Sequence, residues 1–179
     1  EGIAVKKPGE VTKPVVSNLV DDILLVDEQS LEWAVGSLIE QQRVVSEGAG
    51  AAGIAAIRQN PSLFAGKKVG VVICGGNIDP RLLASILNRN MASDGRLARL
   101  RIDISDEPGM LAAITASISR CGGNIVEIYH QRLFYDVPAK LAKIDAVIET
   151  RGPEHVDEII ADLRGSNFLV RQLEDSSAS

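Results

Sequence analysis

The chain has 179 residues, enough for one large domain or two small ones, and its 45% hydrophobic and 24% charged residues are typical of a globular protein. Lys plus Arg is 19 against 24 Asp plus Glu, a net charge of −5, so the basic excess of a nucleic-acid binder is missing. Apolar runs such as 71–74 are far shorter than the ~20 residues of a membrane span. We therefore expect neither a nucleic-acid nor a membrane partner.

Two cysteines, Cys74 and Cys121, are too few for a disulfide framework, and no secretory signal precedes them. These features predict a cytoplasmic protein. The first residue is Glu1 instead of Met, from which we expect a piece of a longer chain.

The part of the chain before a polar hinge at 90–95 has the pattern of an incomplete α/β fold. Residues 21–26 and the nearly all-apolar 67–74 are predicted strands, the second typical of a parallel sheet covered on both faces. Pro8 and Pro14 predict a loop ahead of them. Two strands are too few for a complete sheet.

Helices are predicted between and after these strands. Apolar side chains recur at helical spacing over 31–39, and Asp27 or Ser30 is the expected cap. Residues 47–57 are rich in glycine, which is costly in an isolated helix, so we expect this helix to lie close against another backbone. Asp79 is expected to cap a third helix.

The part after the hinge is predicted to have the order βαββαβ of a ferredoxin-like fold. Asp106 is the expected cap of its first helix. The predicted strands are 97–104, 124–134, 144–149 and 168–173, and the predicted helices are 106–120 and one that begins at Pro153. Apolar side chains expected in the core are Ala98, Leu100, Ile102, Ile104, Leu111, Ile114, Ile118, Val156, Ile159, Ile160 and Leu163.

Several segments resemble the threonine dehydratases (threonine ammonia-lyases), enzymes of fold type II that use pyridoxal phosphate (PLP). The segments are EGIAVKKPG (1–9), SEGAGAAGIAAI (46–57), GKKVGVVICGGNID (66–79) and GRLARLRI (95–102). Two later segments resemble the ACT regulatory domain that follows the catalytic domain in many such enzymes: DEPGMLAAI (106–114) and GGNIVEIYHQR (122–132). The match follows the family's order along nearly the whole chain.

The resemblance implies an α/β fold: part of the parallel sheet of a PLP fold-type II (tryptophan synthase β-like) domain, then a ferredoxin-like ACT domain. The expected boundaries are 1–92 for the C-terminal segment of the catalytic domain, 96–174 for the ACT domain and 175–179 for a disordered tail. The family's Schiff-base lysine motif, similar to S-F-K-x-R-G-A, and its phosphate-binding loop do not occur in this sequence. We therefore expect no catalytic residue here, and no conversion of threonine to 2-oxobutanoate and ammonia by this chain alone.

The resemblance implies that Cys74, Gly75, Gly76 and Asn77 border the cofactor. A neutral thiol at Cys74 would face the pyridine nitrogen of PLP and suit an elimination reaction, and the glycines would let the backbone approach the ring. Glu47 would lie near the same pocket. Two structural alternatives stay open: Cys74 as a buried core cysteine at the end of a strand, and Glu47 as a carboxylate favoured by a helix N-terminus.

The resemblance also implies an effector site between two side-by-side ACT domains, and therefore a homo-oligomer. An amino acid, branched-chain or related, would contact Asp106, Gly109 and Met110 of one copy and Asn124 and Ile125 of the other. Amides at a helix N-terminus suit its carboxylate, and the Asn124 amide both donates and accepts. In the structural alternative, Asp106 is only a helix cap and Asn124 only a turn residue.

No metal site is expected, because neither histidine has ligands at a suitable spacing. We expect His130 at a solvated strand position and His155 in the first turn of a helix. A second class of function also stays open, a stand-alone amino-acid-binding or dimerisation module without catalysis. An upstream reading frame in phase, with the lysine motif, would distinguish the enzyme from the module.

Overall fold

The computed structural model describes residues 6–7, 9–131 and 141–173. Two compact units divide the chain, Glu1–Asn90 (unit 1) and Met91–Ser179 (unit 2). The predicted tail at 175–179 lies outside the described residues, as do most of the first motif, residues 132–134 and Pro138. Within the described part, no helix combines the length and apolar character that crossing a membrane requires.

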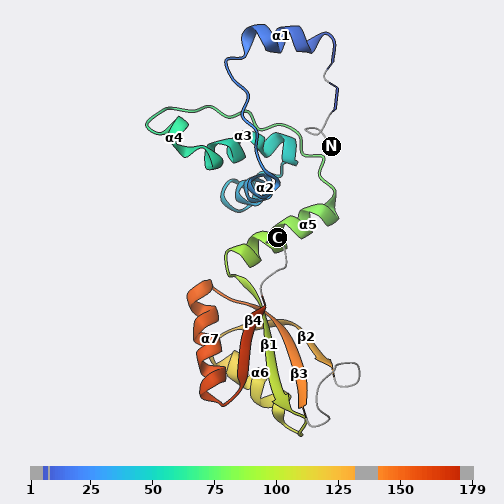
Figure 1. The fold of residues 1–179 in the computed structure, drawn as a ribbon, viewed down its shortest axis with the longest axis vertical. Coiled ribbons are helices and arrows are strands. Elements are labelled where there is room, and N and C mark those ends of the chain that lie inside the picture. The colour runs from blue at the N-terminus through green and yellow to red at the C-terminus, as the bar shows by residue number, and fades with distance from the viewer. Residues whose placement is uncertain (1–5, 8, 132–140, 174–179) are drawn as a thin grey trace. The chain divides into compact units, whose positions relative to one another are not determined.

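Unit 2 contains a four-stranded sheet in the order β2-β3-β1-β4, and all its strand pairs are antiparallel. Both helices of the unit lie against one face of this sheet (Figure 1). The predicted ferredoxin-like order is therefore confirmed. Its elements are β1 (Leu97–Ser105), α6 (Met110–Arg120), β2 (Asn124–Gln131), β3 (Leu141–Glu149), α7 (Pro153–Gly165) and β4 (Leu169–Leu173).

The core of unit 2 follows from the alternation along β1, where every second side chain is buried against α6 and α7. The predicted core residues are buried with one exception. Leu111 is 36% exposed, and Ser117 takes a buried position on α6 instead. A buried hydroxyl needs a partner, and Ser117 donates to the carboxylate of Asp162 on α7.

Helix starts agree with the sequence where the cap directly precedes the helix. Asp27 Oδ1 accepts from the Ser30 N–H at 2.7 Å at the start of α2, so of the two candidates Asp27 is the cap. Asp79 Oδ1 accepts from two amides in the first turn of α5. The prediction for Asp106 is wrong, because α6 begins at Met110 and its N-cap is Gly109, with φ of 93°. A carboxylate four residues ahead of the helix does not take the N-cap place, which immediately precedes the first helical residue.

Unit 1 is helical in its described part, and its two predicted strands are wrong. Residues 21–26 and 67–74 have no strand assignment, and the structure therefore contains no parallel sheet among its described residues (Figure 1). A strand persists only when a neighbour pairs with its backbone, and the described residues supply none for these segments. Apolar side chains consequently face solvent, with Leu25 86% and Val72 84% exposed.

Five helices build unit 1, the last of which ends within unit 2. The loop predicted around Pro14 is wrong, because Pro14 lies in the first turn of α1, where proline is tolerated. The unit's small core joins α2, α3 and α5. The helices are α1 (Thr12–Leu19), α2 (Glu28–Gln42), α3 (Gly48–Gln59), α4 (Pro61–Phe64) and α5 (Pro80–Ser93).

The glycines of α3 allow the close backbone approach that the sequence predicts. A Cβ atom at Gly53 would lie 2.6 Å from Cγ1 of Val71. One at Gly50 would collide with the backbone carbonyl of Cys74. The segment 71–74, part of the predicted strand, therefore packs directly on α3 although it forms no sheet.

A buried ion cluster lies on the sheet face that the helices leave open. Asp145 on β3 breaks the alternation of its strand and is only 7% exposed. Its carboxylate accepts from Arg101 at 2.6 and 2.7 Å and from Arg99 at 2.8 Å. The hydrogen bonds from Arg101, above all, hold the pKa of Asp145 below its ordinary value.

Replacing Asp145 by Asn should lower the free energy of unfolding by about 2 kcal/mol at neutral pH, because two guanidinium groups lose a charged acceptor. Because the pKa of Asp145 is lower in the folded state, its ionised carboxylate stabilises the folded protein fully above the ordinary pKa of 3.8. This stabilisation is lost as the pH falls through the folded-state pKa. The difference between wild type and Asp145→Asn in urea unfolding should therefore shrink below about pH 4.

The matched control is Asp103→Asn, a half-buried carboxylate on the same face of the sheet. A loss in Asp103→Asn as large as that in Asp145→Asn, or a difference that stays constant down to pH 2, would contradict the account of Asp145.

Candidate functional site

The first candidate site lies in unit 1, where the start of α3 meets the segment 74–76. The Glu47 N–H donates to the Gly75 carbonyl at 2.9 Å. The fully buried Ser46 hydroxyl lies 3.3 Å from the same carbonyl and 3.0 Å from that of Glu47. These bonds bring Glu47 next to Cys74 and Gly75, three of the residues that the sequence predicts at one site.

Gly75 has the left-handed φ of 76°, and a Cβ there would lie 2.5 Å from Oε1 of Glu47. Glu47 is the N-cap residue of α3, yet its side chain makes no capping bond. Its carboxylate lies over Gly75, close to the positive end of the helix, so both interpretations of Glu47 remain compatible with its place. Cys74 is exposed, so the alternative of a buried core cysteine is wrong. Gly76 and Asn77 are also exposed and follow directly along the chain.

Of the residues expected beside a cofactor, Cys74, Gly75, Gly76 and Asn77 are exposed and Glu47 is half-buried. The absence of a Cβ at Gly75 leaves room that the Glu47 carboxylate occupies, and the neighbouring Cys74 and Gly76 are exposed.

The second candidate site lies in unit 2, and its residues fall into two groups. Asp106, Gly109 and Met110 follow the end of β1, whereas Asn124 and Ile125 begin β2. Strand register places them at opposite ends of the sheet, because Asn124 and Leu97 both pair with Glu149, while Ser105 pairs with Leu141. Eight residues of strand separate the two ends by about 26 Å. One chain therefore does not bring the two groups together.

Each group presents open polar surface. Asp106 and Gly109 are exposed, and a Cβ at Gly109 would meet nothing within 4 Å. Asn124 is exposed, and its Nδ2 donates to Oε2 of Glu149 at 3.1 Å. Met110 and Ile125 are half-buried and pack on the core of the unit. Each end of the sheet thus offers half of the predicted contacts.

The histidines differ in environment. His155 is 4% exposed in the first turn of α7, as predicted, and its ring joins the Arg151 N–H at 3.1 Å and the Cys121 carbonyl at 2.8 Å. His130 is half-buried on β2. Within the described residues, no group of three His, Cys, Asp or Glu side chains is placed to hold a metal ion.

The two thiols are free cysteines. Burial, together with the nearby carboxylates of Asp162 and Glu158, raises the pKa of the Cys121 thiol. A thiol with a raised pKa carries less of the reactive thiolate, so Cys121 is no candidate nucleophile.

Sequence reasoning missed two polar features of unit 2. The sequence analysis made no prediction for Asp145, and only its interruption of an apolar run in β3 would have indicated a buried charge. Arg164, whose guanidinium donates to the Val170 carbonyl at 3.2 Å, gave no signal, because a cation in the last turn of a helix is common.

Strand order and helix placement define unit 2 as a ferredoxin-like α/β unit, with the predicted effector residues divided between its two ends. No protein-family model matches the chain. The chain is related by sequence to threonine ammonia-lyases over most of its length. It is 39% identical over 171 residues, 96% of its length, to the L-threonine ammonia-lyase of Thermotoga maritima, and 36% identical over 170 residues to that of Geobacter sulfurreducens. It spans 42% of the length of each of these relatives.

A more distant relative is the biosynthetic L-threonine dehydratase of Haemophilus influenzae, at 27% identity over 98% of this chain and 33% of that protein. Among solved structures, the ACT domain of the GTP pyrophosphokinase of Chlorobium tepidum matches 43% of this chain and 96% of its own, with 24% identity and a TM-score of 0.36. The regulatory subunit of the aspartate kinase of Thermus flavus matches 46% of this chain and 54% of its own, with 16% identity and a TM-score of 0.37.

Replacing Gly75 by Ala should destabilise unit 1 by about 1–3 kcal/mol, because alanine is strained at this φ and its methyl group would collide with Glu47. Trp33, the one tryptophan of the chain, lies in α2 and reports on unit 1 by fluorescence during urea unfolding.

The adjacent Gly76→Ala is the matched control, since its Cβ would meet only the Val45 carbonyl at 3.4 Å. Equal unfolding midpoints for the two variants would show that the approach of Glu47 to Gly75 does not form in solution.

Proposed function

We propose that the chain is the C-terminal part of a PLP-dependent threonine ammonia-lyase, with a segment of the catalytic domain at 1–92 and an ACT regulatory domain at 96–174. The observation that carries this proposal is the sequence relation to threonine ammonia-lyases, which extends over both units instead of one. The complete ferredoxin-like order of unit 2 supports the regulatory assignment. The reaction would be the conversion of L-threonine to 2-oxobutanoate and ammonia.

In the catalytic part, Cys74, Gly75, Gly76, Asn77 and Glu47 would border the cofactor. PLP, when bound, supplies an electron sink for the elimination of the threonine hydroxyl. This chain's own contribution would be positional: the Gly75 carbonyl anchors the Glu47 amide, and the Cys74 thiol is exposed beside it. The lysine that binds PLP covalently would come from sequence outside these 179 residues, so the chain alone should be inactive.

In the regulatory part, an amino acid would bind between two copies. If two sheets pair antiparallel about a two-fold axis at their β2 edges, the Asn124 end of one sheet lies beside the Gln131 end of the other. That second end also carries the loop from Asp106 to Met110, by strand register. Pairing at β2 thus brings together the two half-sites that a single chain separates by about 26 Å.

A second candidate, a stand-alone amino-acid-binding or dimerisation module, is favoured by one observation. Unit 2 has a complete sheet and core, whereas unit 1 leaves apolar segments exposed in its described part. An in-phase upstream frame with the lysine motif supports the enzyme, and a start codon at this point supports the module.

The regulatory proposal is tested by thermal unfolding of the full chain with millimolar isoleucine, valine or threonine. A ligand that binds only the folded state adds about 2.7 kcal/mol of stability at a hundredfold excess over its Kd, which raises the midpoint by several degrees. We expect a selective rise with one of these amino acids, and its loss in Asn124→Ala.

Asn60→Ala is the matched control, because it removes a side-chain amide that donates one hydrogen bond in unit 1 and should keep the ligand-induced rise. An equal rise in wild type and Asn124→Ala would remove Asn124 from the site. The absence of any rise would leave the ACT domain with an architectural role only.

A further inference from the structure

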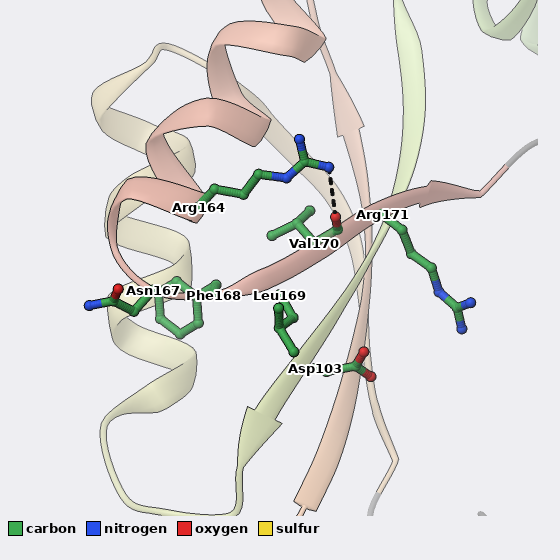
Figure 2. A pocket seen from close by; sticks show the side chains of 7 residues that line it. All are labelled: Asp103, Arg164, Asn167, Phe168, Leu169, Val170 and Arg171. Atoms are coloured by element: carbon green, nitrogen blue, oxygen red, sulfur yellow. Dashed lines mark hydrogen bonds between the residues drawn. The ribbon is translucent and has the colours of Figure 1, made fainter.

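The sheet of unit 2 has two edge strands, β2 and β4, and the β4 edge lies in an open groove of about 620 Å³. The groove runs around the strand, so its polar side chains do not converge on one point. Figure 2 shows Arg164 on the helix side of β4, and Asp103 and Arg171 on the other side. The arrangement suits an added backbone strand better than a small ligand.

Strand register determines which backbone groups of β4 face outward. The Thr150 N–H donates to the Arg96 carbonyl at 2.9 Å, so Arg96 and Thr150, one position before the first β1–β3 pair, are a hydrogen-bonded pair. The backbone N–H and C=O groups of the even-numbered residues of β1 therefore point toward β3. The backbone groups of the odd-numbered residues of β1 point toward β4, and those of their partners Leu169, Arg171 and Leu173 point toward β1. The N–H and C=O groups of Val170 and Gln172 consequently point away from the sheet.

Arg164 covers one of these outward groups. It lies in the last turn of α7, and its Nη2 donates to the Val170 carbonyl at 3.2 Å (Figure 2). This carbonyl is one of the acceptors that an additional strand would need. The bond from Arg164 also places a charged, hydrated guanidinium in the path of an approaching backbone.

We propose that the Arg164 guanidinium prevents β4 from pairing with β4 of a second copy of this chain, so that copies pair only at their β2 edges. This inference rests on the proposed ACT assembly and adds a determinant of which edge is used.

A second copy is the partner that most needs exclusion, because identical strands can always pair antiparallel about a two-fold axis. Leu169, beside the groove, is 74% exposed and would gain burial in such a pair. Pairing at β4 would leave Asn124, on the opposite edge strand β2, without the loop from a second copy. If both edges were open, copies would join in unlimited rows.

The test is sedimentation velocity of the full chain over a hundredfold range of concentration. Arg164→Met keeps an unbranched apolar side chain and removes every donor, and Arg164→Ala serves as a second variant. We expect the weight-average mass of Arg164→Met to reach at least twice that of wild type at the highest concentration, with an unchanged circular dichroism spectrum.

Two further variants test whether the increase in mass arises from pairing at β4. Arg120→Met removes an exposed guanidinium at the end of α6, where it pairs with Asp162, and should keep the wild-type mass. Gln172→Pro removes an outward N–H without loss of a bond to β1, and the double variant Arg164→Met/Gln172→Pro should return to the wild-type mass.

A wild-type mass in both Arg164 variants would overturn the proposal. An increase in weight-average mass that Gln172→Pro does not reverse would overturn it as well. The proposed ACT assembly fails separately, since a wild-type chain that is monomeric at every concentration contradicts pairing at β2 whatever the Arg164 variants do.

Discussion

The register of β1 is the constraint on which unit 2 depends. This strand pairs with β3 on one side and β4 on the other, and its side chains alternate between the helix-covered face and the open face. A shift of one residue would expose Leu100 and Ile102 and bury Arg99 and Arg101. The same register brings both arginines to Asp145 and turns the backbone of Val170 outward, so the core, the ion cluster and the outward backbone groups of β4 have one cause.

The described part of unit 2 forms a closed sheet-and-helix core, whereas that of unit 1 contains an apolar segment without a strand partner. This difference determines how many of the predicted site residues each unit brings together. Unit 2 closes its own core, and the residues of the proposed effector site lie at the two ends of its sheet. Unit 1 brings Glu47 and Gly75 together through backbone bonds, but the apolar segment that leads to Cys74 packs on α3 without a neighbouring strand. The proposed division between regulation and catalysis follows this physical division.

Local patterns predicted most of the elements. The alternation of 97–104, the stripe of α7 and the caps at Asp27 and Asp79 depend on residues within one or two turns, and all of them are confirmed. The strand at 67–74 was wrong because pairing depends on distant backbone that local apolarity does not supply. Asp106 was wrong because Gly109, with its positive φ, intervenes before the helix.

The sequence predicted which residues belong to the candidate sites but not how those residues lie in space. The sequence and the resemblance to threonine dehydratases led to Glu47, Cys74 and Gly75, and a backbone hydrogen bond joins Glu47 to Gly75 in the structure. Asn124 and Asp106 lie at opposite ends of the sheet because α6 leads from the end of β1 back to the start of the parallel strand β2. The order of the elements determines this separation, whereas the register that pairs individual residues is not readable from a single sequence. Arg164 was not found, because its role depends on which carbonyl of β4 faces outward.

Hydrogen exchange on the full chain, followed residue by residue, tests the central claim most directly: unit 2 is a complete folded body, whereas the segment that leads to Cys74 has no strand partner. The account predicts slow exchange for the amides of Leu100, Ile102, Ile144 and Ile148, which β1 and β3 share, and exchange close to the unfolded rate for residues 69–73. Equal protection of residues 69–73 and of β1 would contradict it.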